Sequence, residues 1–522
     1  MNKSDCKINS SVFRYVVPFK YGLTFEEAFK CIDDKKDNWK RKNIKDIKAE
    51  VDLFPYLNEE FNFVSNDEEI TKEKQGYEWL LKNDKYKDFI FHNFKKDESK
   101  NDIKEYSLKF SIEESGLFLF RNNIGFFWYE LKPLFDKVEF NEDVEKKELL
   151  DILLEFQYEI KELNGIKSID GSIVQSFTIL EKNDKKPFVF GNWINSKIGE
   201  LEVTYFAQRP NNYEEICDLI CKYEKIDKKL LGENLKQCDY APDKALMLSF
   251  VCFNEGFKTS SAEKRLLAYR LANGYDQIGI SEESSYKTES PLDNEIWFSS
   301  QEGTSILVWG DKKFNIEIQP SRIKEAYFKL FIKIMYQSYS LSVFTSRIQE
   351  EFPTISKDNL DFETGDKITS LYWDVNNFLL KSTVTSVSYI DKHTLFYNYL
   401  KQQLRIKEDI NSVSAGLEAL NNLQKELFKE NKEIESFRKE EEDKKRSGKI
   451  SALMGLLTIF SLSSGLDSIR ELLNTFINVF QLNIEIIGTI DVVSFVIWIV
   501  IVFITIYITI KTLLDAFSRG NK

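Results

Sequence analysis

An uncharged stretch near the C-terminus constrains this chain more than any other feature. Residues 492–510 form a run of 19 residues without an acidic or basic side chain, and most of them are Val, Ile, Phe or Trp. As a helix this run would be roughly 28 Å long, close to the ~30 Å hydrocarbon core of a bilayer. A buried strand could have this composition, but strands are far shorter. The run therefore predicts a membrane-spanning helix.

A second uncharged segment, residues 450–466, is rich in small and hydroxyl side chains. Such residues are tolerated where a helix packs against other helices or lines a pore. Five of them recur at steps of four, three, three and four, which places them on one helix face. The pattern predicts a pore-lining or oligomer-forming face, although a helix packed only against residues 492–510 would also fit. The five residues are Ser451, Gly455, Thr458, Ser461 and Gly465.

The flanking charges predict the orientation of these two segments. Basic residues precede the first segment and follow the second, whereas residues 467–491 between them contain Arg470 as their one basic residue. Lys and Arg are enriched in cytoplasmic loops. We therefore expect a multi-pass protein of the inner or plasma membrane with both termini in the cytoplasm. The expected transmembrane domain covers residues 449–514, with an outer loop at about 467–491 and a cytoplasmic tail at 515–522.

A long helical pattern precedes the first segment. Between residues 391 and 448, Ile406, Val413, Leu420, Leu427 and Ile434 recur every seven residues and mark a heptad seam. The complementary seam positions become polar toward residue 448. The pattern predicts a stalk helix that associates with other copies of the chain, or else one amphipathic helix lying on its own domain.

Residues 1–390 predict an α/β cytoplasmic sensor domain. Residues 106–131 resemble a β-meander, with turns expected at 113–116 and at Asn122-Asn123. Helices are expected over 141–163, 213–221, 262–272 and 322–349, and strands over 296–318. The net charge of −12 argues against a general nucleic-acid-binding surface. Six scattered cysteines without CxxC spacing are typical of a reducing compartment.

The order of stalk helix, first span, short outer loop and second span resembles the CorA family of divalent-cation channels. The phrase LLTIFSLSSGL looks like the first-span segment of that family. The resemblance implies five copies around a central pore and a fold made of an α/β cytoplasmic domain, a long stalk helix and a two-helix C-terminal transmembrane hairpin. The Gly-Met-Asn motif of CorA channels is missing, because the sequence after Gly465 reads LDSIRELLN.

Several phrases of the N-terminal region resemble a divergent CorA-like group found beside type III CRISPR systems. They are SGLFLFRNNIGFFWYEL, RLLAYRLANGYD, EIWFSSQEGTSILVW and AYFKLFIKIMYQSYSLSVF. The resemblance implies a membrane effector of antiviral defence. It also implies activation by a nucleotide second messenger, in part of this group an S-adenosylmethionine–AMP conjugate.

Catalytic motifs are missing from the sequence, which has no Walker phosphate loop, no GxGxxG and no HExxH, and has two histidines. We therefore expect no enzyme. A nucleotide would need aromatic or guanidinium stacking and donors for phosphate. Side chains of these kinds cluster at one helix end and a nearby strand and turn, although ordinary helix capping and core packing would also explain them. The candidates are Arg265, Tyr269, Arg270, Asn273, Tyr275, Asp276, Trp297 and Gln301.

The predicted membrane segments, together with what these resemblances imply, favour a homopentameric CorA-like channel, gated by a nucleotide ligand, as an effector in type III CRISPR defence. Its expected partners are membrane lipid, copies of itself and a small nucleotide, without direct nucleic-acid binding. A magnesium-type divalent metal ion transporter with an altered selectivity filter is the first alternative, and magnesium would then be its cation. A membrane-anchored scaffold or enzyme is the second alternative.

Overall fold

The computed structural model describes residues 6–42, 53, 76–82, 88–95, 103–141, 147–161, 163, 166–169, 172–175, 177–181, 188–210, 240–273, 288–352, 362–382 and 386–463. It also describes short runs and single positions between 470 and 511. The chain divides into two compact units. One comprises residues 1–353 and 371–417, and the other comprises residues 354–370 and 418–522.

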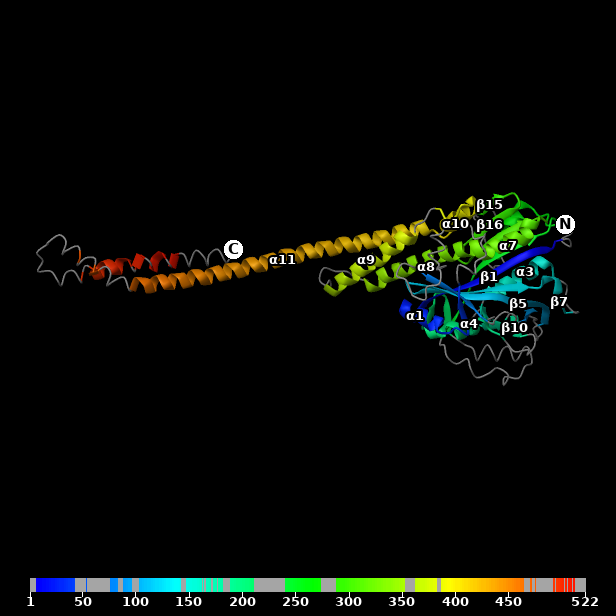
Figure 1. Ribbon diagram of the computed structural model, residues 1–522, viewed down its shortest axis with the longest axis horizontal. Coiled ribbons are helices and arrows are strands. Elements are labelled where there is room, and N and C mark those ends of the chain that lie inside the picture. Colours follow the sequence, from blue (N-terminus) through cyan, green and yellow to red (C-terminus); the bar gives the residue numbers. More distant parts are fainter. Residues whose placement is uncertain are drawn as a thin grey trace, which may run out of the picture. The chain divides into compact units, whose positions relative to one another are not determined.

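One large mixed sheet forms the centre of the first unit (Figure 1). In the described part of the chain it has 13 strands, nine of them in the order β10-β4-β5-β6-β1-β14-β17-β16-β15. Their bounds are β1 Ile8–Tyr21, β4 Asp88–Lys95, β5 Ile103–Phe120, β6 Ile124–Pro133, β10 Phe177–Glu181, β14 Leu246–Phe253, β15 Glu289–Leu292, β16 Glu295–Ser299 and β17 Gly303–Trp309. The remaining strands of this sheet are β2 Trp39–Arg41, β3 Gly76–Leu81, β7 Glu139–Phe140 and β11 Val203–Tyr205.

Among the described residues, the β-rich part also contains two two-stranded sheets and short helical turns. The pairs are β8 (Ile166–Ile169) with β9 (Ser172–Gln175), and β12 (Gln208–Pro210) with β13 (Tyr240–Pro242). The 3₁₀ turns are η3 (Phe135–Lys137) and η4 (Gly199–Leu201).

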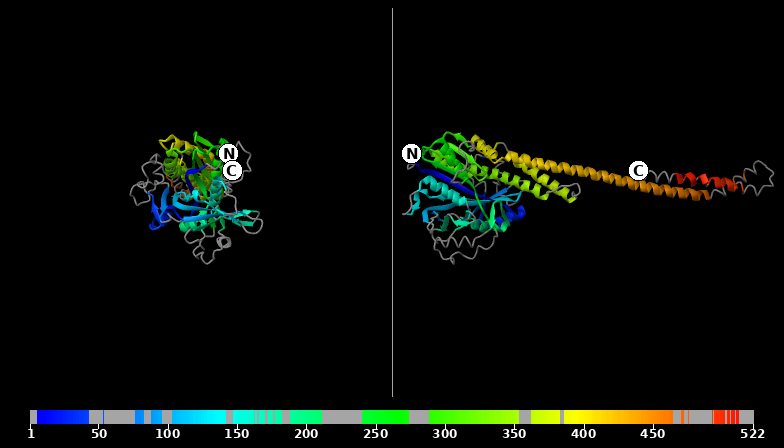
Figure 2. Two further views of the ribbon diagram at one scale, coloured as in Figure 1. Left: turned by 90° about the vertical axis from the view of Figure 1, so that its right-hand side faces the viewer. Right: turned by 180° about the vertical axis from the view of Figure 1, so that it is seen from behind.

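The central strands of the sheet, such as β6 and β14, are nearly continuous apolar and aromatic runs that are buried on both faces. On one face, Phe13, Tyr15 and Phe19 of β1 join Phe127 and Tyr129 of β6 in a large buried cluster. Helices cover that face, as the views from the front and from behind show (Figures 1 and 2). They are α1 (Phe25–Asp33), α3 (Leu149–Lys161), α4 (Phe190–Ile198) and α6 (Ser261–Asn273).

The opposite face of the sheet is covered by a long helical run. Phe120 stacks on Tyr336 with ring centroids 4.1 Å apart, and Trp128 meets Phe328 at 5.1 Å. The run consists of the π-helical turn η6 (Phe314–Ile318), α7 (Gln319–Arg322), the π-helical turn η7 (Ile323–Tyr327) and α8 (Phe328–Glu351). Helix α10 (Asp391–Gln403) joins this layer, because Phe396 packs against Trp297 at 5.2 Å.

A β-bulge interrupts β5 where the sequence suggested a turn. Ile112 pairs with Leu131 and Glu114 pairs with Glu130, so Glu113 is an extra residue on this strand. The expected turn at residues 113–116 is therefore wrong, and β5 continues to Phe120. The expected turn at Asn122-Asn123 is confirmed, and Asn123 has the positive φ of 61° that such a turn requires.

The other helix and strand predictions are confirmed in part. The expected helices over 141–163, 262–272 and 322–349 correspond to α3, to α6 and to the run from α7 to α8. Strand β17 lies within 296–318 and β16 overlaps its start, as expected, but residues 314–318 form the π-helical turn η6. The predicted helix over 213–221 lies outside the described residues.

The predicted stalk consists of two helices. Helix α10 ends at Gln403 and α11 covers Ile406–Ser463, and Arg405 between them has a φ of 54°. Ile406, Val413 and Leu417 are buried in the first unit, so the start of the heptad seam packs onto the domain. In the second unit α9 (Phe362–Ser382) meets α11 where Gln424 donates to the carbonyl of Gly365 at 2.9 Å.

The predicted fold with a two-helix transmembrane hairpin is wrong for the part of the chain that the structure describes. There, no helix is both long enough and apolar enough to cross a membrane. The apolar end of α11 extends from residue 450 to Ser463, and the turns before it carry Lys444, Lys445, Arg446 and Lys449. The described positions from 492 to 511 are helical in short runs, with exposed side chains such as Phe495 and Phe503.

The side chains of the predicted pore-lining face are outside the described part. Ser451, Gly455, Thr458 and Ser461 belong to α11, but the structure describes their backbone alone, and Gly465 lies outside the described residues. Among the described residues, no group of three or more His, Cys, Asp or Glu side chains is placed to hold a metal ion.

Candidate functional site

The sequence placed the ligand site at the C-terminal end of α6, and part of that cluster does assemble. The Ser300 hydroxyl donates to Asn273 Oδ1 at 2.5 Å, so the β16–β17 turn meets the end of α6. The Lys161 ammonium donates to the Asn273 carbonyl at 2.9 Å and pairs with Glu302. These protein groups satisfy the helix end as a cap does, because a cation stabilises the last carbonyls of a helix.

The remaining predicted site residues are dispersed. Arg265 is exposed, and Arg270 is half-buried with its Nε shielded from solvent and without a hydrogen-bond partner among the described residues. Tyr269 packs edge-on against Phe298 at 5.1 Å. Gln301 is exposed in the β16–β17 turn. The structure does not describe Tyr275 or Asp276.

Trp297 lies on the other face of the sheet from α6. Its ring contacts Phe396 and Tyr399 of α10, and its Nε1 donates to the buried Glu295 carboxylate at 2.6 Å. The neighbouring Phe298 is the residue that faces α6, because successive side chains of a strand alternate between faces. Trp297 therefore belongs to the core under α10 and not to the predicted cluster.

A groove at the opposite end of α6 is the stronger candidate. Strands β14 and β17 are parallel neighbours, from Met247 beside Gly303 to Phe253 beside Trp309. Their carboxyl ends thus meet at one edge, and α6 follows β14 directly. Ligands of sheets with parallel strands bind outside these carboxyl ends. A groove of about 790 Å³ lies there, lined by Glu255, Gly256, Lys258, Leu292, Asp293, Asn294, Trp309, Gly310 and Lys312.

The floor of the groove is held by hydrogen bonds to backbone carbonyls. Gly310 has a φ of 120°, which only glycine adopts readily, and its amide donates to the Phe253 carbonyl at 2.9 Å. Asn294 Nδ2 donates to the Trp309 carbonyl at 3.0 Å. These bonds tie the ends of β14, β16 and β17 together and fix the turn that carries Lys312.

An aromatic ring and several lysines give the groove its chemistry. Lys264 of α6 places Nζ 3.9 Å from the centroid of the half-buried Trp309 ring, within the range of a cation–π contact. Burial lowers the pKa of Lys264. Lys258 and Lys312 are exposed on the two turns after β14 and β17, and Glu255 and Asp293 are exposed beside them. The lining therefore offers charges of both signs around one indole.

The start of α6 is capped by its own residues. The Glu263 amide donates to Ser260 Oγ at 3.2 Å, and the Ser260 amide donates to the Glu263 carboxylate at 2.8 Å. This capping box is visible in the sequence as S-x-x-E before an apolar run. A strand, a glycine turn and a capped helix were thus recognisable, but their closeness to the second turn at Gly310 required the β14–β17 pairing.

Comparisons with known proteins give no family for the chain. No protein-family model, no curated protein and no solved structure matches it.

Proposed function

We propose that the protein is a ligand-controlled effector of the CorA-like type that acts at a membrane in type III CRISPR defence. Its ligand would be a nucleotide second messenger bound in the groove at the carboxyl ends of β14 and β17. The observation that carries the ligand site is this groove, which combines an indole ring with lysines and carboxylates on two strand-end turns. Its volume lies within the range of small-molecule sites. The role in defence at a membrane is what the sequence resemblance to CorA-like effectors implies.

The lining suits a ligand that has an aromatic base and charges of both signs. A base would displace the Lys264 ammonium and stack on Trp309, because the base and the ammonium would occupy the same face of the ring. Lys258 and Lys312 would pair with phosphate, and Glu255 and Asp293 would accept from amino or hydroxyl groups. An S-adenosylmethionine–AMP conjugate has all of these groups, which is why we favour it over a plain nucleotide.

The turn at Gly310 links the groove to the helical layer. Lys312 stands between β17 and the π-helical turn η6, which leads into α7, η7 and α8. A ligand held by Lys312 would bias the position of this run, provided that it binds one arrangement better than another. We propose that the response reaches the C-terminal part of self-associated copies, five in a CorA-like arrangement. There the exposed side chains of Val492, Phe495 and Phe503 would contact lipid and change its ion permeability.

Calorimetry on the full chain in mild detergent tests the ligand site. The S-adenosylmethionine–AMP conjugate should bind at least tenfold more weakly to a Lys258→Ala/Lys312→Ala variant, because two charge-assisted contacts are lost. Lys313→Ala is the matched control, since Lys313 is exposed beside Lys312, pairs with Glu317 at 3.5 Å and is not part of the lining. Equal loss in the control would contradict the site.

Arg270→Ala separates this groove from the site expected from the sequence. The groove proposal predicts unchanged affinity for that variant, because Arg270 lies near the other end of α6. A large loss of binding would return the site to the C-terminal end of the helix.

Ion release from liposomes tests the output. The full chain in vesicles should release a trapped cation when the conjugate is added, and the Lys258→Ala/Lys312→Ala variant should not. Release that is independent of the conjugate would favour a transporter, and no release with intact binding would favour a scaffold.

A further inference from the structure

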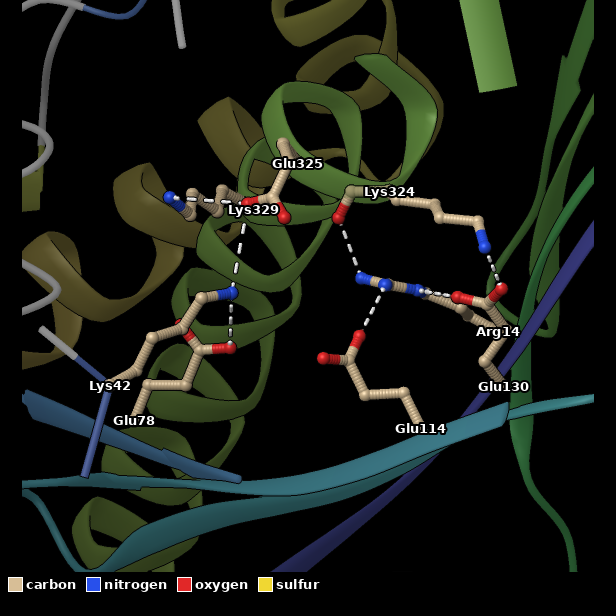
Figure 3. A network of polar contacts seen from close by, with 8 residues as sticks. All are labelled: Arg14, Lys42, Glu78, Glu114, Glu130, Lys324, Glu325 and Lys329. Atoms are coloured by element: carbon tan, nitrogen blue, oxygen red, sulfur yellow. Dashed lines mark hydrogen bonds and ion pairs between the residues drawn. The ribbon is translucent and has the colours of Figure 1, made fainter. Parts of the chain in front are cut away.

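A network of eight charged residues lies between the central sheet and the helical run that covers it (Figure 3). Four are basic and four are acidic, so their formal charges balance. Five come from strands or a strand end of the sheet layer and three come from η7 and α8. They are Arg14, Lys42, Glu78, Glu114, Glu130, Lys324, Glu325 and Lys329.

Arg14 of β1 is the centre of one half of the network. Its Nε donates to Glu130 at 3.0 Å, one terminal nitrogen donates to Glu114 at 3.2 Å, and the other donates to the Lys324 carbonyl at 2.6 Å. Although burial opposes the charge of Glu130, Arg14 and Lys324 lower the pKa of its carboxyl. The sheet thus contacts η7 at the backbone carbonyl of Lys324 as well as at its side chain.

The guanidinium of Arg14 also lies between two rings. Its central carbon is 4.5 Å from the Trp128 ring centroid and 4.4 Å from that of Phe328. Such stacking is available to a planar guanidinium and not to an ammonium. In this half of the network each guanidinium nitrogen of Arg14 has a hydrogen-bond partner.

The other half is built from lysines. Lys42 pairs with Glu78 at 3.3 Å and with Glu325 at 3.6 Å. Burial opposes its charge, but these carboxylates raise the pKa of Lys42. Lys329 of α8 is as buried as Arg14, and its ion pair with Glu325 is longer, at 3.9 Å. The Glu325 carboxylate therefore pairs with two ammonium groups.

Among the lysines of the network, Lys329 is the one whose pKa is lowered. Burial is the main reason that its pKa falls to about 7, and the charges of Lys42 and Arg14 lower it further, against the pull of Glu78 and Glu325. A further titratable group of the same helical layer is His393 of α10, whose ring meets Tyr327 of η7 at 5.1 Å. Lys324 and Glu325 belong to η7, whose π-helical turn departs from the α-helical hydrogen-bond pattern.

We propose that this network is a proton-operated latch. When the Lys329 amine is neutral, η7 and α8 are held tightly on the sheet, and when it is protonated they are held more loosely. The proton goes to or from solvent when the run opens, and no other group has to change its charge. The latch is independent of the proposed ligand and would regulate the helical run directly.

The direction of the pH effect follows from the pKa of Lys329. In the closed state this pKa is about 7, whereas exposed lysine has its ordinary value of about 10.5. Between these values the open state binds the proton and the closed state does not. Raising the pH therefore favours the closed state, by up to roughly tenfold in the opening equilibrium per pH unit, while below pH 7 the effect levels off.

Hydrogen exchange of the full chain in mild detergent tests the latch. Amides of Ile323–Tyr327 and of the buried part of α8 should gain protection between pH 7 and 9, after correction for the intrinsic exchange rate. Lys329→Met keeps the length of the side chain without its charge, and should give high protection that no longer depends on pH. Lys329→Arg keeps the charge at every pH, and should give low protection that is equally independent of pH.

Lys333→Met is the matched control. Lys333 is also a buried lysine of α8, one turn further on, and its variant should keep the wild-type pH dependence. The proposal is overturned if wild-type protection does not change between pH 7 and 9. It is also overturned if Lys329→Met keeps the wild-type slope, because His393 or another group would then carry the effect.

Discussion

The two faces of the central sheet exclude water by different means. On the face under α3 and α4, aromatic rings fill the space, with Tyr129 stacked on Tyr15 at 5.3 Å and on Phe190 at 4.7 Å. On the face under η7 and α8, rings pack against a network of charged residues in which Arg14 and Glu130 are buried. The cost of truncating an apolar side chain increases with the volume removed, whereas removing one partner of a buried ion pair leaves an uncompensated charge. The two faces should therefore respond differently to mutation, pH and salt.

The largest expected effect is on the charged face. Arg14→Ala should lower the free energy of unfolding by about 3–5 kcal/mol, because Glu130 and Glu114 lose a buried partner. Urea unfolding of the full chain in detergent, followed by tryptophan fluorescence, measures it. Arg14→Met with Glu130→Leu should recover much of the loss, since an apolar pair can replace a buried ion pair. A loss below 1 kcal/mol for Arg14→Ala would remove the contrast between the faces.

Close packing on the apolar side gives the next largest effect. In Gly303→Ala the new Cβ would lie 2.6 Å from the Ala272 carbonyl oxygen and 2.7 Å from that of Met247. Both atoms are backbone, so α6 or β14 must shift, and we expect a loss of about 1–3 kcal/mol. The same unfolding assay measures the loss, and wild-type stability would show that α6 can move away freely.

A smaller step on the apolar face sharpens the comparison. Ile160→Val removes one methylene from a fully buried side chain of α3 and should cost about 0.5–1.5 kcal/mol. The substitution neither adds nor removes an ionisable group, so the loss should be the same at pH 7 and at pH 9. A loss that varied with pH would mean that the apolar face is coupled to the charged one.

The smallest effect is expected for an ion pair near the surface. Arg347 pairs with Asp374 at 3.1 Å, and the Asp374 side chain is 51% exposed. Asp374→Asn should cost less than about 1 kcal/mol, and even this should disappear in high salt because exposed pairs are screened. Unfolding curves at low and high salt measure this loss. A loss of the same size at both salt concentrations would show that this exposed pair behaves like the buried network.

Local patterns in the sequence predicted much of the secondary structure. The helix expected over 262–272 is α6 (Ser261–Asn273), because its capping box and apolar periodicity are local signals. Residues 314–318 were expected to be a strand, since Phe314, Ile316 and Ile318 alternate with polar residues. In the structure Phe314 and Ile318 are both exposed, and Asn315 is buried instead. The alternation of apolar and polar residues there does not correspond to buried and exposed positions, so the strand prediction was wrong.

The two sites depended on pairings that local patterns do not specify. The groove needs β14 beside β17, which are about 50 residues apart in the chain. The charged network joins Arg14 to Glu114, Glu130 and Lys324, and each of these lies in a different element. Charged residues in a sequence usually belong to exposed surfaces, so their burial became visible only with the complete sheet.

The bulge at Glu113 determines which face of β5 carries a charge. Before it, Phe110 and Ile112 belong to the aromatic face, and after it Leu117 and Leu119 do, so the numbering of that face changes from even to odd. Glu114 consequently points to Arg14 instead of into the rings. Losing Glu113 would leave a regular strand with both faces preserved, whereas losing one residue elsewhere in β5 would exchange them. Natural variation in the length of this strand should therefore be confined to that one position.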